Sequence, residues 1–228
     1  MMTEKVQSTL LNDALREQIA SVLKCMESNV TLVTIVDPEN KKSMELRDLV
    51  IDLASLGDKL EVMVKVKGED LDLEQKINSD KFPVVALLDQ LGNYSRVKFH
   101  GVPGGQELNA FLLSIYNLAG PGQAIDAKTL EEMKSISQKI NLKVAVSLSS
   151  RLCPDVVVSA ARIALENPNV EVEMLDIANF PELNEKYNIT AVPCLIINDE
   201  KVTFGVKSIQ EIIKLLIVWN KREKSLNE

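Results

Sequence analysis

The chain contains few of the residues that proteins use most often for metal binding and acid–base catalysis. Its 228 residues include one histidine, three cysteines and one tryptophan. The single histidine, His100, and the wide separation of the three cysteines argue against a metal site and against a Ser–His–Asp triad, so we expect neither. An odd number of cysteines in a chain of this length gives no disulfide framework and suits a reduced protein.

Long apolar runs and basic clusters are also missing. Even Ile209–Trp219 is interrupted by Gln210, Glu211 and Lys214, which argues against a membrane span. The first ten residues lack the apolar segment and cleavage site of a secretion signal. A net charge of −7 without a basic cluster argues against nucleic acid as a ligand. These absences predict a cytoplasmic protein that binds neither nucleic acid nor membrane.

The hydrophobic pattern indicates two similar halves. Gly120-Pro121-Gly122 is the strongest break near the middle of the chain, so we expect a first lobe of residues 1–121 and a second of residues 122–228. In the first lobe the periodicity predicts helices over 10–26, 44–56, 70–77 and 107–118, and strands over 30–36, 60–66, 82–88 and 95–99. In the second it predicts helices over 126–140, 153–165, 182–187 and 209–220, and strands over 142–148, 170–177, 192–197 and 201–204.

Each half has the pattern of a β-α-β-α-β-β-α unit, so the chain contains two copies of it. The β-α-β start predicts two parallel strands with a right-handed crossover, and the tight hairpin predicts an antiparallel pair. This order is that of the thioredoxin-like (glutaredoxin-like) fold, so we expect an α/β protein with two tandem lobes, each a mixed sheet flanked by helices. Our overlay of the halves places Val30 on Leu142, Asp37 on Ser149, Lys41 on Cys153, Pro83 on Pro193 and Gly101 on Gly205.

One stretch of the second lobe combines a strand with a helix start. The apolar run that ends at Leu148 leads into Ser150-Arg151-Leu152-Cys153, and Pro154 lies in the first turn of the predicted helix. Free N–H groups and the helix dipole at such a junction stabilise a thiolate, which is why disulfide oxidoreductases place a Cys-x-x-Cys pair there. Here the pair reads Ser-x-x-Cys, so only one of the two thiols needed for two-electron disulfide chemistry is present.

The motif S-L-S-x-x-x-C-P-D-V-V, followed by A-V-P at 191–193, resembles the N-terminal domain of the flavoprotein component of alkyl hydroperoxide reductase. The chain is also similar to two-lobed protein disulfide oxidoreductases. Both families are tandem thioredoxin folds of about this length, so the resemblance covers nearly the whole chain, with specific matches at 148–157 and around Pro193. In both families a cysteine stands at the position of Ser150.

The resemblance implies further properties of the site. The prolines at 83 and 193 are expected to be cis, with Pro193 beside the strand–helix junction. Val192, Pro193 and Arg151 would then contact a protein thiol or disulfide partner, such as a flavoprotein reductase or a peroxiredoxin. No cofactor is expected, because the chain ends soon after Trp219 and leaves no room for the flavin and nicotinamide modules to which the resembling domain is normally attached.

Cys153 is the leading candidate for a reactive thiol, and Ser150 marks the position of the lost nucleophile. Cys153 corresponds to the second, buried cysteine of the related pairs, so it can also be an inert structural thiol. Ser150 is expected to cap the helix by accepting a first-turn N–H. Arg151 either makes the site electropositive or points into solvent.

The remaining candidates have simpler interpretations. Strand alternation places Cys194 on the face opposite Pro193, which argues against a Cys153–Cys194 pair. Cys25 is expected in the core of the opening helix. The corresponding segment of the first lobe, Asp37–Lys41, has no thiol and is expected to be a solvated turn.

Two functions from different classes remain. In the first, the protein is a thiol–disulfide redox protein with a degenerate Ser-x-x-Cys site, capable at most of monothiol exchange through Cys153. In the second, it is a redox-inactive thioredoxin-like module that binds a peptide or a redox partner protein. The sequence leaves open whether the chain is an enzyme, which partner it has and how it oligomerises.

Overall fold

The helices and strands of the computed structural model follow the predicted order. The structure describes residues 6–227, with side chains described up to residue 222. The elements of the first half are α1 (Asp13–Leu23), β1 (Val30–Val36), α2 (Lys42–Ala54), β2 (Leu60–Val66), α3 (Leu71–Lys76), β3 (Val84–Leu88), β4 (Tyr94–His100) and α4 (Glu107–Ala119). Those of the second half are α5 (Ala127–Lys134), β5 (Ile140–Val146), α6 (Cys153–Glu166), β6 (Val170–Asp176), α7 (Glu182–Lys186), β7 (Cys194–Ile197), β8 (Lys201–Phe204) and α8 (Ile209–Asn227).

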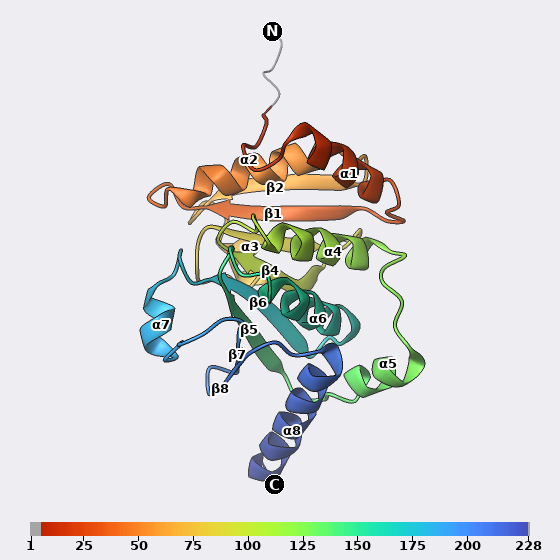
Figure 1. Cartoon of the computed structure of the whole chain (residues 1–228), viewed down its shortest axis with the longest axis vertical. Coiled ribbons are helices and arrows are strands. Elements are labelled where there is room, and N and C mark those ends of the chain that lie inside the picture. The colour runs from red at the N-terminus through yellow and green to blue at the C-terminus, as the bar shows by residue number, and fades with distance from the viewer. Residues whose placement is uncertain (1–5, 228) are drawn as a thin grey trace.

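All the described strands belong to one sheet with the order β2-β1-β3-β4-β6-β5-β7-β8 (Figure 1). In each half the first two strands are parallel, and the other neighbours are antiparallel. The chain therefore has the predicted α/β fold of two tandem thioredoxin-like lobes. The lobes are joined by the parallel pairing of β4 with β6, which the sequence did not predict.

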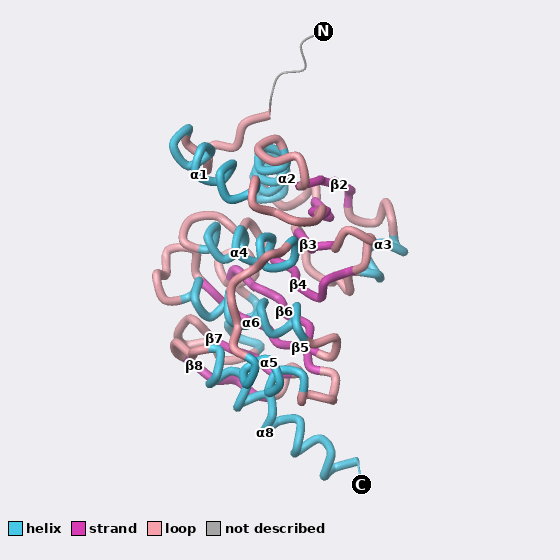
Figure 2. Tube along the Cα trace, turned by 90° about the vertical axis from the view of Figure 1, so that its right-hand side faces the viewer, coloured by secondary structure: helices cyan, strands magenta, loops and turns pink. Residues whose placement is uncertain are grey.

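The two faces of the sheet are covered unequally. The large core contains buried side chains of the sheet and of α1, α2, α4, α5, α6 and α8. Two smaller cores lie on the opposite face, one beside α3 and one beside α7. Figure 2 shows α4 and α6 on one side of the sheet and α3 on the other. No helix within residues 6–227 is long and apolar enough to cross a membrane.

The structure corrects the ends of two predicted helices and the bounds of one strand. The last helix, predicted over 209–220, extends to Asn227. The helix expected over 126–140 ends at Lys134, and the next strand begins at Ile140, two residues earlier than predicted. The side chain of Asn220 on α8 accepts hydrogen bonds from the backbone N–H groups of Ser137 and Gln138. This tertiary contact holds the intervening segment in a non-helical turn.

The overlay of the two lobes is wrong by two residues at its start. In the structure, adding 110 to a residue number relates β1 to β5, β2 to β6 and Pro83 to Pro193 without a gap. Asp37 then corresponds to Ser147, and Ser43, rather than Lys41, corresponds to Cys153. A slip of two residues keeps every strand side chain on its own face, so the hydrophobic pattern does not detect it.

The pairing of β4 with β6 buries a group of charged residues on the face that carries α3 and α7. Lys98 on β4 is fully buried, and its Nζ lies 2.6 Å from Glu171 Oε1 and 3.9 Å from Glu173 Oε1 on β6. The same ammonium group donates to the carbonyl oxygens of Ile77 and Asn78. We call the pairing of β4 with β6 the seam between the lobes. Because each N–H of this ammonium group has an acceptor, the seam can bury these charges.

Replacing Lys98 by Met should therefore destabilise the protein strongly. The change leaves Glu171 without its buried cation and removes one of the two ammonium groups within 4 Å of Glu173. Breaking such a buried pair typically costs about 3–5 kcal/mol. Urea unfolding followed by circular dichroism measures the difference. Lys65→Met is the control, because Lys65 pairs with Glu69 at the surface, and its unfolding midpoint should stay close to that of the wild type. Equal effects of the two substitutions would contradict the proposed importance of the seam.

Candidate functional site

The strand–helix junction of the second lobe is a tight turn between β5 and α6. The N–H of Ser150 donates to the carbonyl oxygen of Ser147 over 2.8 Å, and Ser150 Oγ accepts from the N–H of Leu152 over 3.3 Å. The helix begins at Cys153 with Pro154 in its first turn, as predicted, but Leu152 occupies the N-cap position. Ser150 therefore stabilises the turn before the helix, rather than the helix N-terminus itself.

Cys153 lies at the start of α6 and has no exposed surface. Burial raises the pKa of its thiol, and the neighbouring Glu107 adds to the rise. Hydrogen bonds with the Ser150 side chain and the Ser147 backbone act in the opposite direction but do not overcome burial. The thiol is therefore held in its protonated, less nucleophilic form, which favours the inert interpretation.

Glu107 is the residue of this region that sequence reasoning missed. It belongs to the first turn of α4 in the first lobe, is fully buried, and neither of its carboxylate oxygens has a partner among the described residues. Burial and the nearby Asp176 raise the pKa of Glu107 to about 8. An acidic residue in a first helical turn is ordinary in a sequence, so only the packing of the two lobes reveals its position.

A cis proline borders the junction, as the resemblance implied. The Val192–Pro193 peptide is cis, and so is the corresponding Phe82–Pro83 peptide of the first lobe. Pro193 is buried, and Val192 packs against the large core that also contains Cys153. Within the described residues the backbone of Val192 makes no hydrogen bond. Arg151 is exposed, which agrees with its interpretation as a solvated residue.

The other two cysteines lie away from Cys153. Cys194 belongs to the small core beside α7, on the opposite face of the sheet, as strand alternation predicted. Burial raises the pKa of Cys194 to about 11. The expectation for Cys25 was wrong: α1 ends at Leu23, and Cys25 is exposed in the turn that follows. The structure therefore brings Ser150 and Cys153 together and leaves the other thiols apart.

The first lobe has a turn with the same hydrogen bonds but different side chains. The N–H of Asn40 donates to the carbonyl oxygen of Asp37, and Asn40 Oδ1 accepts from the N–H of Lys42, as Ser150 does for Leu152. Ser43 stands in place of Cys153 and is also buried. Asn40 Nδ2 donates to the carbonyl oxygen of Phe82. The backbone carbonyl of the residue before this cis proline therefore already has a hydrogen-bond partner within the protein.

Comparisons with known proteins agree with this geometry. A family described as a thioredoxin domain matches residues 140–217. A solved structure of the alkyl hydroperoxide reductase AhpF from Enterococcus faecalis is 36% identical with a TM-score of 0.88, and the match covers 91% of this chain and 100% of that one. The chain belongs to the family of AhpF N-terminal domains. The crystal structure of the corresponding domain of the E. faecalis protein gives a TM-score of 0.87 at the same identity, covering 90% of this chain and 99% of that one.

Membership in this family places the chain among thioredoxin-type, thiol–disulfide oxidoreductase-like proteins. The curated alkyl hydroperoxide reductase AhpF of Staphylococcus aureus is 29% identical over 207 residues, which are 91% of this chain but 38% of that protein. The chain thus spans about two fifths of the length of the curated relatives it matches. A protein disulfide oxidoreductase from Aeropyrum pernix shares the fold, with a TM-score of 0.83 at 21% identity over 94% of this chain and 95% of that one.

Maleimide labelling should distinguish the three thiols. We expect one thiol to react in the native protein, because Cys25 is exposed while Cys153 and Cys194 are buried with raised pKa values. All three should react in denaturant. Intact-mass spectrometry counts the adducts, and Cys25→Ser, the control, should show none under native conditions. A second native adduct at Cys153 would contradict its assignment as a protected thiol.

The raised pKa of Glu107 predicts a pH-dependent stability. Between the ordinary carboxyl pKa of about 4.5 and the folded value of about 8, the folded state binds more protons at this site than the unfolded state. Stability should therefore fall as the pH rises through this window. The wild type should lose about 4 kcal/mol of stability at this site between pH 5 and pH 9, and Glu107→Gln should lack this loss.

Urea unfolding at both pH values measures this difference. Glu211→Gln is the matched control, because Glu211 lies in the first turn of α8 in the second lobe but is exposed. It should leave the wild-type trend unchanged between pH 5 and pH 9. A parallel decline in Glu107→Gln would show that another group is responsible.

Proposed function

We propose that this chain is a redox-silent docking module derived from a thiol–disulfide oxidoreductase. The observation that carries the proposal is the junction itself: a partly exposed serine stands at the first position of the pair, and the remaining thiol is buried with a raised pKa. A dithiol exchange needs an attacking thiolate and a second thiol that resolves the mixed disulfide. Ser150 cannot do either, and burial of Cys153 hinders both.

The surface beside Val192 and Pro193 supports a role in docking. An extended peptide binds beside a strand by pairing with free backbone N–H and C=O groups, and those of Val192 have no partner among the described residues. In the first lobe the equivalent carbonyl, that of Phe82, accepts from Asn40. We therefore propose that the second lobe alone keeps a binding edge, formed by Val192 and Pro193 with the exposed Arg151 nearby.

The names of the relatives suggest the class of partner. Because the chain matches the N-terminal portion of the alkyl hydroperoxide reductase AhpF, its partner would be a protein with a thiol or disulfide, such as a flavoprotein reductase or a peroxiredoxin. The alternative function is monothiol exchange through Cys153. The Ser150 side chain and the Ser147 backbone favour this alternative, because both lower the pKa of the Cys153 thiol.

We also propose that the two lobes meet at residues 121 and 122, as the sequence indicated. This boundary is supported by the constant offset that relates the strands of the two halves and by the position of Gly120-Pro121-Gly122 between α4 and α5. Because β4 pairs with β6, the lobes would act as one rigid unit despite the boundary.

The test is to restore the missing sulfur. The wild type should not turn over in an insulin reduction assay with dithiothreitol, because it cannot resolve a mixed disulfide. Ser150→Cys places a new thiol three residues before Cys153, which begins the helix, and the pKa of this new thiol should be below about 8.5. The two thiols should therefore form a reversible intramolecular disulfide. Thiol titration before and after oxidation should show the loss of two thiols.

Asn40→Cys is the matched control. It introduces a thiol into the equivalent turn of the first lobe, where Ser43 replaces the second cysteine, so no intramolecular disulfide should form. Turnover by the wild-type protein would overturn the redox-silent proposal and favour exchange through Cys153. Failure of a folded Ser150→Cys variant to oxidise would show that this junction does not have the geometry of a redox pair.

A further inference from the structure

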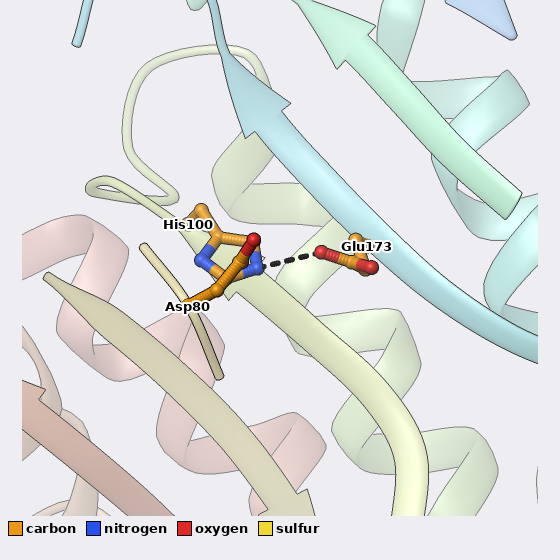
Figure 3. Close-up of side chains that lie close together, drawn as sticks. All are labelled: Asp80, His100 and Glu173. Carbon is orange, nitrogen blue, oxygen red and sulfur yellow. Dashed lines mark hydrogen bonds and ion pairs between the residues drawn. The ribbon is translucent and has the colours of Figure 1, made fainter. Parts of the chain in front are cut away.

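We propose that Asp80, His100 and Glu173 form a binding site for a divalent first-row metal ion at the seam between the two lobes (Figure 3). Asp80 lies in the loop before β3, His100 ends β4, and Glu173 lies in the middle of β6. The site is separate from the strand–helix junction and independent of the proposed docking role. Its residues come from both lobes, so an ion there would bridge them.

The three side chains converge closely enough to share one ion. One ligand atom from each residue lies within 4.8 Å of the others. An ion with bonds of about 2.0–2.2 Å to nitrogen and oxygen holds its ligand atoms roughly 3–4 Å apart, so small side-chain movements would complete the coordination. One imidazole and two carboxylates suit Zn²⁺ or Mn²⁺, with water filling the remaining positions.

The imidazole of His100 is already oriented as a metal ligand. Its Nδ1 lies 2.9 Å from the carbonyl oxygen of Lys81, which can only accept a hydrogen bond, so Nδ1 carries a hydrogen. Nε2 then points at Glu173 Oε2, 2.9 Å away. Metal-binding histidines usually donate their other ring N–H to a carbonyl or carboxylate, which fixes the ring. A metal ion would replace the hydrogen between Nε2 and Oε2.

Glu173 presents one oxygen to the site and uses the other for support. Its Oε1 accepts from the side-chain amide of Asn141 and lies 3.9 Å from Lys98 Nζ and 3.7 Å from Lys143 Nζ. These cations keep the carboxylate charged and leave Oε2 directed at His100. They would also weaken the attraction for an ion, which predicts reversible binding rather than a permanently held structural metal.

The charges around the imidazole leave room for one more cation. Four carboxylates lie in the connected cluster, and three ammonium groups pair with them within 4 Å. The carboxylates are Asp80, Glu171, Glu173 and Asp199, and the ammonium groups are Lys81, Lys98 and Lys143. With a neutral imidazole the cluster carries a net charge of −1, which favours binding of a cation at His100.

Asp80 gives the ion a path from solvent. Its side chain is 70% exposed, while those of His100 and Glu173 are almost completely buried. The carboxylate of Asp80 is paired with Lys81 Nζ at 2.5 Å, and an arriving cation would displace this neighbouring lysine. Because Asp80 is the exposed member, it can be replaced without disturbing the buried seam.

The chain has one histidine, which makes the test direct. Tag-free protein in a Cys25→Ser background removes the exposed thiol as a competing ligand. Zn²⁺ titrated by calorimetry should bind with one site per chain, and Mn²⁺ should broaden the single imidazole signal in a ¹⁵N spectrum. Zn²⁺ should also raise the melting temperature in a concentration-dependent way, because it binds only the folded protein.

Variants then separate the proposed site from unspecific binding. Asp80→Asn should weaken Zn²⁺ binding by about tenfold or more, since even groups that only support ligands contribute this much. His100→Gln should abolish it. Asp72→Asn, which removes an exposed carboxylate from α3, should bind as the wild type does. No saturable binding, an unchanged imidazole signal, or equal affinity of Asp80→Asn and Asp72→Asn would each overturn the proposal.

Discussion

The parallel pairing of β4 with β6 is the interaction on which the rest of the structure depends. Parallel strands end at the same edge of a sheet, so the loop after β4 reaches the turn after β5. There the N–H of Gln106 donates to the carbonyl oxygen of Leu148 over 3.0 Å. Gly105 permits the approach, because a Cβ at its position would lie 2.7 Å from that oxygen. This contact brings Glu107 of the first lobe to Cys153 of the second.

Most of the fold could be predicted because the sequence patterns that specify each helix and strand lie within that element. The β-rich run at 30–36, the alternation within 60–66 and the helical spacing of 107–118 each fall within one element, and the observed elements match them closely. The failures came from contacts between distant elements. The turn held by Asn220 shortened α5, and the shifted start of β5 then misaligned the two lobes by two residues. A pattern of period two does not register such a slip.

The candidate site divides in the same way. Ser150, Cys153 and Pro193 could be located from the sequence because a strand end, a helix start and a proline before a hairpin each have a local signal. Glu107 could not, because its burial depends on the other lobe. The seam was equally hidden: Lys98 and Glu173 alternate with apolar residues as they would on a solvent-facing strand. Only the pairing of two lobe edges turns these positions inward.

The continuous sheet also changes what the repetition of the lobe means for self-association. A separate lobe would expose β4 or β6 as an unpaired edge, and such an edge invites pairing with strands of other molecules. Joining the lobes removes both of these edges at once. The outer edges that remain are β2, which carries Glu61 and Lys65, and β8, which has four residues and begins with Lys201. Charge and shortness make both poor templates, so the repetition doubles the sheet while leaving it with no more than the two open edges of a single lobe.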